Sequence, residues 1–220
     1  MKIIRCTLIV ICCLCFTTLQ AQVVLGLKSG ATKAWEDYGD VATPEGANIH
    51  INGFQLSALA YYKIKPNFWV GMEPGWVERG AACEPGFLIF NEDTKLFLNY
   101  LEVPVMTAVQ LPIYRQQFHL RAKAGFGASY IASAFREIRD LNNVEPTTRN
   151  RLTFEGEGAM SRWDYGFHGG LALSYSVGKH EILLDGNYYY GLPDVDAFVT
   201  SRNRTLNISI GYLIHLQAQQ

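Results

Sequence analysis

The sequence predicts an all-β fold, an eight-stranded antiparallel up-and-down barrel that spans a membrane. Apolar residues recur at every second position over several long stretches, and the connections between these stretches alternate between short and long. No apolar run beyond the N-terminus reaches the roughly 18 residues that a membrane-spanning helix needs. The clearest stretch is 118–134, FHLRAKAGFGASYIASA, with apolar even positions and mostly basic, small or hydroxylated odd positions. Because successive side chains of a strand point to opposite faces, this period of two indicates a strand with one apolar face.

The N-terminus has the features of an export signal. Lys2 and Arg5 supply positive charge, a short apolar core follows, and Ala21 ends the expected cleavage region. We therefore expect residues 1–21 to be a signal peptide and residues 22–220 to form one outer-membrane β-barrel domain. A single anchoring helix is the alternative, but the apolar core is short for one.

Composition agrees with a strand-rich membrane protein. Charged residues make up 18% of the 220, below the roughly 25% of ordinary soluble domains. Aromatic residues make up 13%, and there are 20 glycines. The net charge of −1 gives no reason to expect a nucleic acid as partner. Signal cleavage would leave Cys83 as the one remaining cysteine, an incidental free thiol with no intramolecular disulfide.

Alternation places each strand in turn. The expected strands are 23–31, 53–64, 68–77, 96–111, 118–134, 161–177, 181–192 and 204–216. The apolar faces of the first four carry, in order, Val23, Leu25 and Leu27; Phe54, Leu56 and Tyr62; Phe68, Val70 and Trp76; and Leu101, Val103 and Val105. Those of the last four carry Phe118, Leu120 and Phe126; Phe167, Leu171 and Leu173; Ile182, Leu184 and Tyr188; and Leu206, Ile208 and Ile210. Pro74 and Pro104 cannot donate to a ladder and predict bulges or strand ends.

The connections distinguish the two ends of the expected barrel. The turns at 65–67, 112–116 and 178–180 are short, whereas the connections at 34–52, 78–95, 135–160 and 193–203 are long. Bacterial outer-membrane barrels have short periplasmic turns, long extracellular loops and an even number of strands. The alternation therefore predicts that both chain ends and all short turns face the periplasm.

Aromatic spacing indicates that the apolar face meets lipid. Four strands carry an aromatic pair eight residues apart: Phe54 and Tyr62, Phe68 and Trp76, Phe118 and Phe126, and Phe167 and Tyr175. Eight residues span about 27 Å along a strand. At a tilt of about 40° this projects to about 21 Å, close to the roughly 25 Å apolar band that aromatic girdles flank. The alternatives are a secreted lipocalin-like soluble barrel with an apolar pocket, or a membrane barrel that binds a small hydrophobic ligand.

Several short segments, in this order and spacing, are similar to one protein family. They are Tyr100-Leu101-Glu102-Val103-Pro104, Gly125-Phe126-Gly127, Asp164-Tyr165-Gly166-Phe167-His168-Gly169-Gly170, Tyr190-Gly191-Leu192 and Asn207-Ile208-Ser209-Ile210-Gly211-Tyr212. From about Gln22 to Leu216 the chain resembles the PorT-like outer-membrane β-barrel proteins of Gram-negative bacteria. The resemblance implies an eight-stranded barrel in the outer membrane. The name-giving member is tied to a protein-secretion system, a role that these short motifs do not transfer to this chain.

The polar face is expected to fill the lumen with a structural charge network. Its expected members are Lys28, Glu73, Glu102, Arg121, Lys123, Arg162, Asp164 and Asp185. Eight strands leave an interior just wide enough for side chains, so these charges must pair with one another or with trapped water. Specifically, Glu102 is expected to pair with Arg121 or Lys123 on the next strand. A proton or ion path is the alternative interpretation.

No motif predicts catalysis, a cofactor or a metal site. The Gly125–Tyr130 segment begins like a dinucleotide fingerprint but lacks its third glycine and a following helix. His119, His168 and His215 fall on different expected strands without metal-ligand spacing. Asp164 and His168 with a nearby serine resemble hydrolase residues, but along a strand they do not come within hydrogen-bond reach. The chain is therefore not expected to be an enzyme.

The long loops are the expected functional surface. Trp35, Tyr38 and 87–90, Phe-Leu-Ile-Phe, give these loops apolar anchors, although 87–90 alternatively extends its hairpin. The expected partners are outer-membrane lipid and a protein at the extracellular loops or the periplasmic turns. The sequence thus predicts a structural or partner-binding barrel with a filled polar lumen, in the outer membrane of a Gram-negative bacterium.

Overall fold

The computed structural model describes residues 23–37, 50–83, 92–114, 117–140, 148–152, 154, 161–194 and 201–216. These residues form ten strands: β1 (Val23–Asp37), β2 (Ile51–Lys65), β3 (Phe68–Met72), β4 (Gly75–Cys83), β5 (Glu92–Tyr114), β6 (Phe118–Asp140), β7 (Thr148–Arg151), β8 (Trp163–Val177), β9 (His180–Gly191) and β10 (Arg202–Leu216). Within the described ranges, no helix is both long and apolar enough to traverse a membrane.

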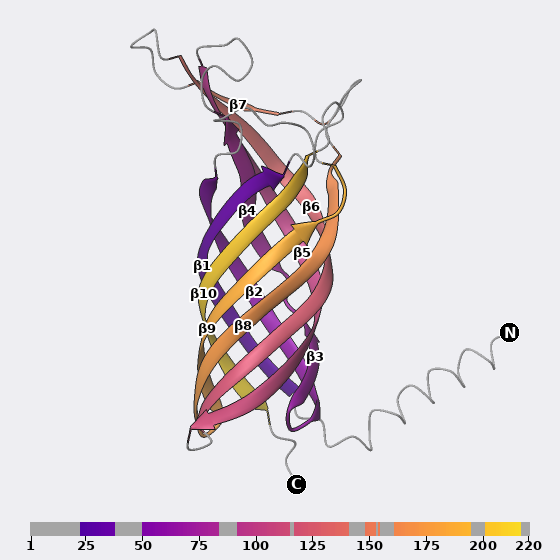
Figure 1. Ribbon diagram of the computed structural model, residues 1–220, viewed down its shortest axis with the longest axis vertical. Coiled ribbons are helices and arrows are strands. Elements are labelled where there is room, and N and C mark those ends of the chain that lie inside the picture. The colour runs from indigo at the N-terminus through magenta and orange to yellow at the C-terminus, as the bar shows by residue number, and fades with distance from the viewer. Residues whose placement is uncertain are drawn as a thin grey trace, which may run out of the picture.

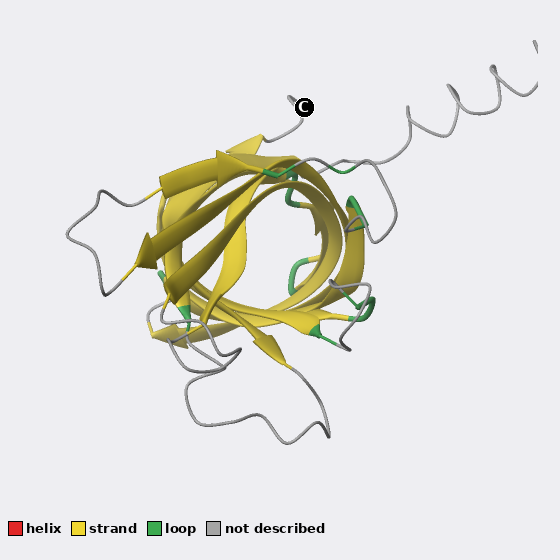
Figure 2. Ribbon diagram, turned by 90° about the horizontal axis from the view of Figure 1, so that it is seen from above, coloured by secondary structure: helices red, strands yellow, loops and turns green. Residues whose placement is uncertain are grey.

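The strands close into an antiparallel barrel whose wall has eight positions, which we call staves (Figures 1 and 2). Each stave is a single strand, except for one that consists of β3 and β4 in succession. Closure comes from β1 and β10, which pair from Val23 opposite Leu216 to Asp37 opposite Arg202. β3 and β4 are successive halves of one stave, because each pairs with β2 on one side and β5 on the other. β7 pairs with β6 at the end of the barrel (Figure 1). The predicted eight-stranded up-and-down barrel is thereby confirmed.

Pro74 and Pro104 lie at one interruption of the sheet. Glu73 and Pro74 separate β3 from β4, so Pro74 marks a strand end as predicted. Pro104 lies inside β5, and its carbonyl accepts a hydrogen bond from the Glu73 N–H at 3.0 Å. Because both backbone polar groups of an antiparallel residue point to the same neighbour, the Pro104 nitrogen faces this interruption. Pro104 has no backbone N–H to donate, but the sheet is already interrupted at that point, so no ladder hydrogen bond is lost.

The apolar face of every stave points outward. Phe54 is 47% exposed, Leu173 46% and Ile210 67%, whereas Arg121 is 2% and Asp185 1% exposed. A soluble lipocalin-like barrel would have the reverse arrangement, with apolar side chains around an internal pocket. The lipocalin-like alternative is therefore wrong. The outward apolar surface is the one expected of a barrel that spans a membrane.

The barrel has a short-turn end and a long-loop end. The short-turn end comprises the turns at 66–67 and 178–179, the adjoining ends of β5 and β6 at Tyr114 and Phe118, and the strand ends Val23 and Leu216. Gly178 has a φ of +62°, a left-handed conformation that favours glycine in so tight a turn. The long-loop end comprises the connections 38–50, 84–91, 141–162 and 192–201, with β7 inside the third of them.

The hairpins extend further toward the long loops than alternation predicts. β4 continues to Cys83, which lies opposite Thr94, and β5 and β6 remain paired as far as Glu92 and Asp140. β1 likewise includes Trp35, whose ring centroid lies 6.1 Å from that of Tyr188. Trp35 is thus a strand residue, and its assignment to a loop is wrong. The expected signal peptide 1–21, Tyr38 and 87–90 lie outside the described residues.

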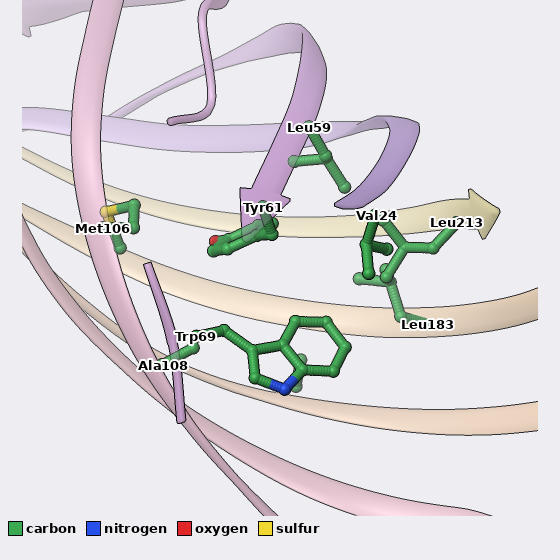
Figure 3. Close-up of a cluster of buried hydrophobic side chains, with 9 residues drawn as sticks. Val24, Leu59, Tyr61, Trp69, Met106, Ala108, Leu183 and Leu213 are labelled. Carbon is green, nitrogen blue, oxygen red and sulfur yellow. The ribbon is translucent and has the colours of Figure 1, made fainter. Parts of the chain in front are cut away.

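An apolar layer fills part of the interior near the short-turn end. Its buried members are Val24, Leu59, Tyr61, Trp69, Met106, Ala108, Ala172, Leu183 and Leu213 (Figure 3). Trp69 is the largest of them and is fully buried. We call this set the apolar layer. It gives the lumen a packed base against which charged side chains lie.

Candidate functional site

The centre of the lumen holds four charged side chains, Lys28, Glu73, Lys123 and Asp185, which we call the central charge cluster. The Lys28 Nζ donates to Glu73 Oε2 at 2.5 Å and to Asp185 Oδ2 at 2.7 Å. The Lys123 Nζ donates to Glu73 Oε1 at 3.0 Å and to the same Asp185 oxygen at 2.7 Å. Each side chain is at most 3% exposed. Two lysines and two carboxylates make the cluster neutral, as buried charges require.

The four members of the cluster come from four different staves of the barrel. Lys28 lies on β1, Glu73 at the break between β3 and β4, Lys123 on β6 and Asp185 on β9. In the order of the ring these are alternate staves. The lumen of an eight-stranded barrel is only wide enough for side chains. Four charged side chains from alternate staves therefore meet inside this narrow lumen.

Tyr61 connects this cluster to the apolar layer. Its ring packs edge-on against Trp69, with centroids 6.0 Å apart, and its hydroxyl donates to Glu73 Oε1. Glu73 thus accepts from Lys28, Lys123 and Tyr61. Three donors hold the Glu73 carboxylate in one orientation, so the side chains of the cluster have a fixed arrangement.

A second cluster lies closer to the long-loop end around Arg79 of β4. Its guanidinium donates to Glu102 and, at 3.2 Å, to Ser129 Oγ, and it lies 3.8 Å from Asp164 Oδ2. The expected pairing of Glu102 with Arg121 or Lys123 is wrong. The ladder places Glu102 opposite Ser129, several residues along β6 from both of those cations.

Aromatic rings hold the Arg79 guanidinium in place. Its Cζ lies 3.8 Å from the Tyr189 ring centroid and 5.0 Å from that of Tyr100. Arg79 is 0% exposed, so these cation–π contacts and the carboxylates replace its water. Asn203 completes the cluster, donating to Tyr100 Oη at 2.9 Å and to Asp164 Oδ2 at 2.8 Å.

A third cluster lies at the short-turn end. Arg121 donates to Gln110 Oε1 at 2.6 Å and to Glu181 Oε1 at 2.6 Å. The other Glu181 oxygen accepts from His215 Nε2 at 2.7 Å, and His215 Nδ1 lies 2.9 Å from the Lys63 Nζ. The Arg121 guanidinium lies 4.0 Å from the Trp69 ring centroid, against the apolar layer.

Sequence reasoning omitted Arg79 and Glu181 from the charge network. Arg79 lies an even number of positions from Trp69, Glu73 and Val77, which are all buried and point inward. This even spacing from buried residues was the signal that Arg79 points inward. It was missed because the expected third strand ended at residue 77. Glu181 was assigned to the polar face but, as the first residue after a turn, was not counted among the lumen charges.

Arg162 does not join the lumen clusters. It precedes β8, is only partly buried, and donates to Tyr130 Oη at 2.9 Å. Its guanidinium lies 4.3 Å from the Phe154 ring centroid. Its assignment to the lumen network is therefore wrong: β8 begins at Trp163, two residues later than the alternation indicates, so Arg162 lies just before the strand.

The histidines and acidic residues are distributed over separate contacts. His168 lies 3.2 Å from Asn187 Nδ2, whereas Asp164 bonds to Asn203, so these two do not form a hydrolase-like pair. Over the part of the chain that the structure describes, no group of three or more His, Cys, Asp or Glu side chains is placed to hold a metal ion.

The expected girdle residues lie on the outer face of the barrel. The exposed or partly buried set is Phe54, Tyr62, Phe68, Trp76, Phe118, Phe126, Phe167 and Tyr175. Neighbouring strands pair these rings at two levels. Phe118 on β6 lies 4.8 Å from Tyr175 on β8, and Phe126 lies 5.5 Å from Phe167, measured between ring centroids.

A closed barrel with a polar lumen and an apolar exterior agrees with the family comparison. Residues 17–197 match the family described as "Outer membrane protein beta-barrel domain". The chain belongs to this family. The match covers all staves except the last, β10, which closes the ring against β1. No curated protein matched the sequence.

Solved structures of similar proteins include three outer-membrane or surface proteins. Ail, the attachment invasion locus protein of Yersinia pestis, is 11% identical, with 88% of this chain and 99% of that chain covered and a TM-score of 0.43. Neisserial surface protein A is 14% identical, with 87% and 97% covered and a TM-score of 0.45. Outer Membrane Protein W of E. coli is 13% identical, with 88% and 99% covered and a TM-score of 0.44.

Proposed function

We propose that this outer-membrane barrel is a structural or partner-binding protein with a closed lumen, which acts through its long loops and is neither a pore nor an enzyme. The observation that carries the proposal is the central charge cluster. Lys28, Glu73, Lys123 and Asp185 converge from alternate staves at 2.5 to 3.0 Å. Opening a path for solutes would require these buried ion pairs to separate, which is strongly unfavourable in a low-dielectric interior.

Two further features support closure. The Arg79 cluster lies on the long-loop side of the central charge cluster, and the apolar layer packs beside it through Tyr61. A solute that crossed the lumen would have to displace the central charge cluster, the Arg79 cluster and the apolar layer. An internal site for a small hydrophobic ligand finds no support in these polar contacts. The pocket that the described residues form at the short-turn end is also lined mainly by polar side chains.

The proposal includes export and placement in the membrane. We infer that residues 1–21 direct export and that the outer-face aromatic rings lie at the two lipid–water boundaries of a Gram-negative outer membrane. We also infer membership of the PorT-like group, and this inference does not extend to the secretion role of its name-giving member. The long loops then face the exterior, where loops on a rigid scaffold bind partners.

Planar-bilayer recordings test the closed lumen. The refolded full-length chain is expected to insert without unitary conductance steps. Electrophoretic heat-modifiability of the same sample is the control that the barrel is folded. Steady conductance steps from a folded sample would overturn the proposal in favour of a pore.

Photo-crosslinking tests which end of the barrel meets a partner. Asn52 and Asn67 are a matched pair, because both are exposed asparagines and they lie at the long-loop and short-turn ends respectively. A photoreactive residue at position 52 is expected to give a protein adduct in intact cells, and one at position 67 is not. Adducts from position 67 alone would instead indicate a periplasmic partner.

A further inference from the structure

The short-turn end of the barrel contains a pocket of about 260 Å³. Its polar lining consists of Lys63, Gln110, His119, Ser176, Lys179 and His215. The Gly178-Lys179 turn forms part of its rim, and the turn is tied to β10 by a hydrogen bond from the His215 N–H to the Lys179 carbonyl at 2.8 Å. The pocket therefore has a fixed wall built from strand ends and one tight turn.

The pocket carries excess positive charge. Its lining contains two lysines and no carboxylate. The adjacent carboxylate, Glu181, is already engaged by Arg121 on one oxygen and by His215 on the other. Three cations, Lys63, Lys179 and Arg121, and one carboxylate, Glu181, lie in or beside the pocket. The net charge of this group is therefore +2.

The excess positive charge of the pocket does not depend on a protonated His215. His215 Nδ1 lies 2.9 Å from the Lys63 Nζ and its Nε2 lies 2.7 Å from a Glu181 oxygen. Lysine can only donate and a carboxylate can only accept. The contacts therefore assign neutral His215 with its hydrogen on Nε2.

Donor groups remain available toward the pocket. Lys63 uses one ammonium hydrogen on His215 and is held 4.7 Å from the Trp69 ring centroid. Gln110 accepts from Arg121 through its oxygen, so its amide NH₂ is left as a donor. Ser176 lies 3.4 Å from His119 at the same wall. Ammonium, amide and hydroxyl donors around one space are the groups that bind an oxyanion.

We propose that this pocket binds a phosphate or carboxylate oxyanion that enters from the short-turn end. Lys63 and Lys179 supply the charge, and Gln110 and Ser176 supply neutral donors. The site is independent of the partner-binding proposal, which concerns the opposite end of the barrel. The oxyanion has two sources, a small ion in solution or the headgroup phosphate of a membrane lipid.

Titration of the folded full-length chain with inorganic phosphate, and separately with acetate, tests the proposal. At constant ionic strength, with chloride as reference, the ring resonances of His119 and His215 are expected to shift saturably. Loss of one charge-assisted hydrogen bond in Lys63→Gln should weaken binding roughly 10-fold or more. Lys179→Gln, on an exposed turn, should weaken it without disturbing the barrel.

Lys33→Gln is the matched control, because Lys33 is an exposed lysine of β1 toward the long-loop end. It removes the same charge and should leave binding unchanged. In phosphatidylglycerol nanodiscs, shifts that are present without added ion and lost in Lys179→Gln would identify the lipid headgroup as the source. No saturable shift in either setting, or equal effects of Lys33→Gln and Lys179→Gln, would overturn the proposal.

Discussion

Arg79 of β4 donates to Glu102 of β5 although the two residues do not face each other in the ladder. Gly75 lies opposite Glu102, and Arg79 lies opposite Leu98. The guanidinium therefore reaches back along the lumen to meet its carboxylate. Arg79 is fully buried, and Glu102 is the nearer of the two carboxylates that compensate its charge.

Glu102→Gln is expected to destabilise the barrel toward the lower end of the roughly 3–5 kcal/mol that breaking a buried ion pair costs. The loss is moderated because Asp164 remains 3.8 Å from the guanidinium. Urea unfolding of the refolded protein, or its heat-modified electrophoretic transition, measures the change. In a double-mutant cycle, Arg79→Met with Glu102→Gln should cost less than the two single changes added together. Strict additivity would mean that the two side chains do not interact.

The faces of the strands could be predicted from sequence, but the pairing between them could not. Alternation placed Lys28, Glu73, Lys123 and Asp185 on the polar face, the aromatic spacing predicted that this face points inward, and all four are buried there. Their contacts depend on the stagger between staves, which follows from how the sheet closes rather than from any local pattern. A long arginine that reaches four residues along a strand, as Arg79 does, adds a second unknown.

Strand ends were the other limit of sequence reasoning. Inward residues near the long loops, such as Ala81 and Ala82, are consecutive and buried, so the period of two is lost there. Gly80, between Arg79 and Ala81, has a φ of +143° that breaks the regular pleat. The expected strand consequently ended too early and left Arg79 outside it.

Asp185→Asn is expected to destabilise the barrel strongly, because Lys28 and Lys123 both donate to one Asp185 oxygen. The amide leaves two buried ammonium groups with Glu73 as their single carboxylate, and a loss on the order of 3–5 kcal/mol follows. Asp194→Asn is the control, since its pair with Arg202 at 3.4 Å is nearly half exposed. That change should cost about 0–1 kcal/mol. Similar urea midpoints for both variants would contradict a cohesive central charge cluster.

A lysine on the outer face should reveal the depth of the lipid contact. Ile210 is 67% exposed near the middle of β10, and Val177 is 57% exposed at the short-turn end of β8. Ile210→Lys is expected to cost about 2–4 kcal/mol of folding free energy in phospholipid vesicles, and Val177→Lys about 0–1 kcal/mol. Urea titrations in vesicles measure both. Equal costs at the two positions would count against a membrane that covers the middle of the barrel.

Two adjacent glycines of β8 differ in the space beside them. A Cβ on Gly170 would lie 2.4 Å from the Gly186 carbonyl oxygen, a backbone atom that cannot move aside, whereas one on Gly169 would meet nothing within 4 Å. Gly170→Ala is therefore expected to destabilise the barrel by roughly 1–3 kcal/mol, as overpacking does. Gly169→Ala adds a methyl group to the outer face and should leave stability unchanged or slightly higher, because the unfolded chain loses conformational freedom. Parallel urea titrations of the two variants compare them directly. If Gly169→Ala were the more damaging, the assignment of inner and outer faces along β8 would have to be reversed.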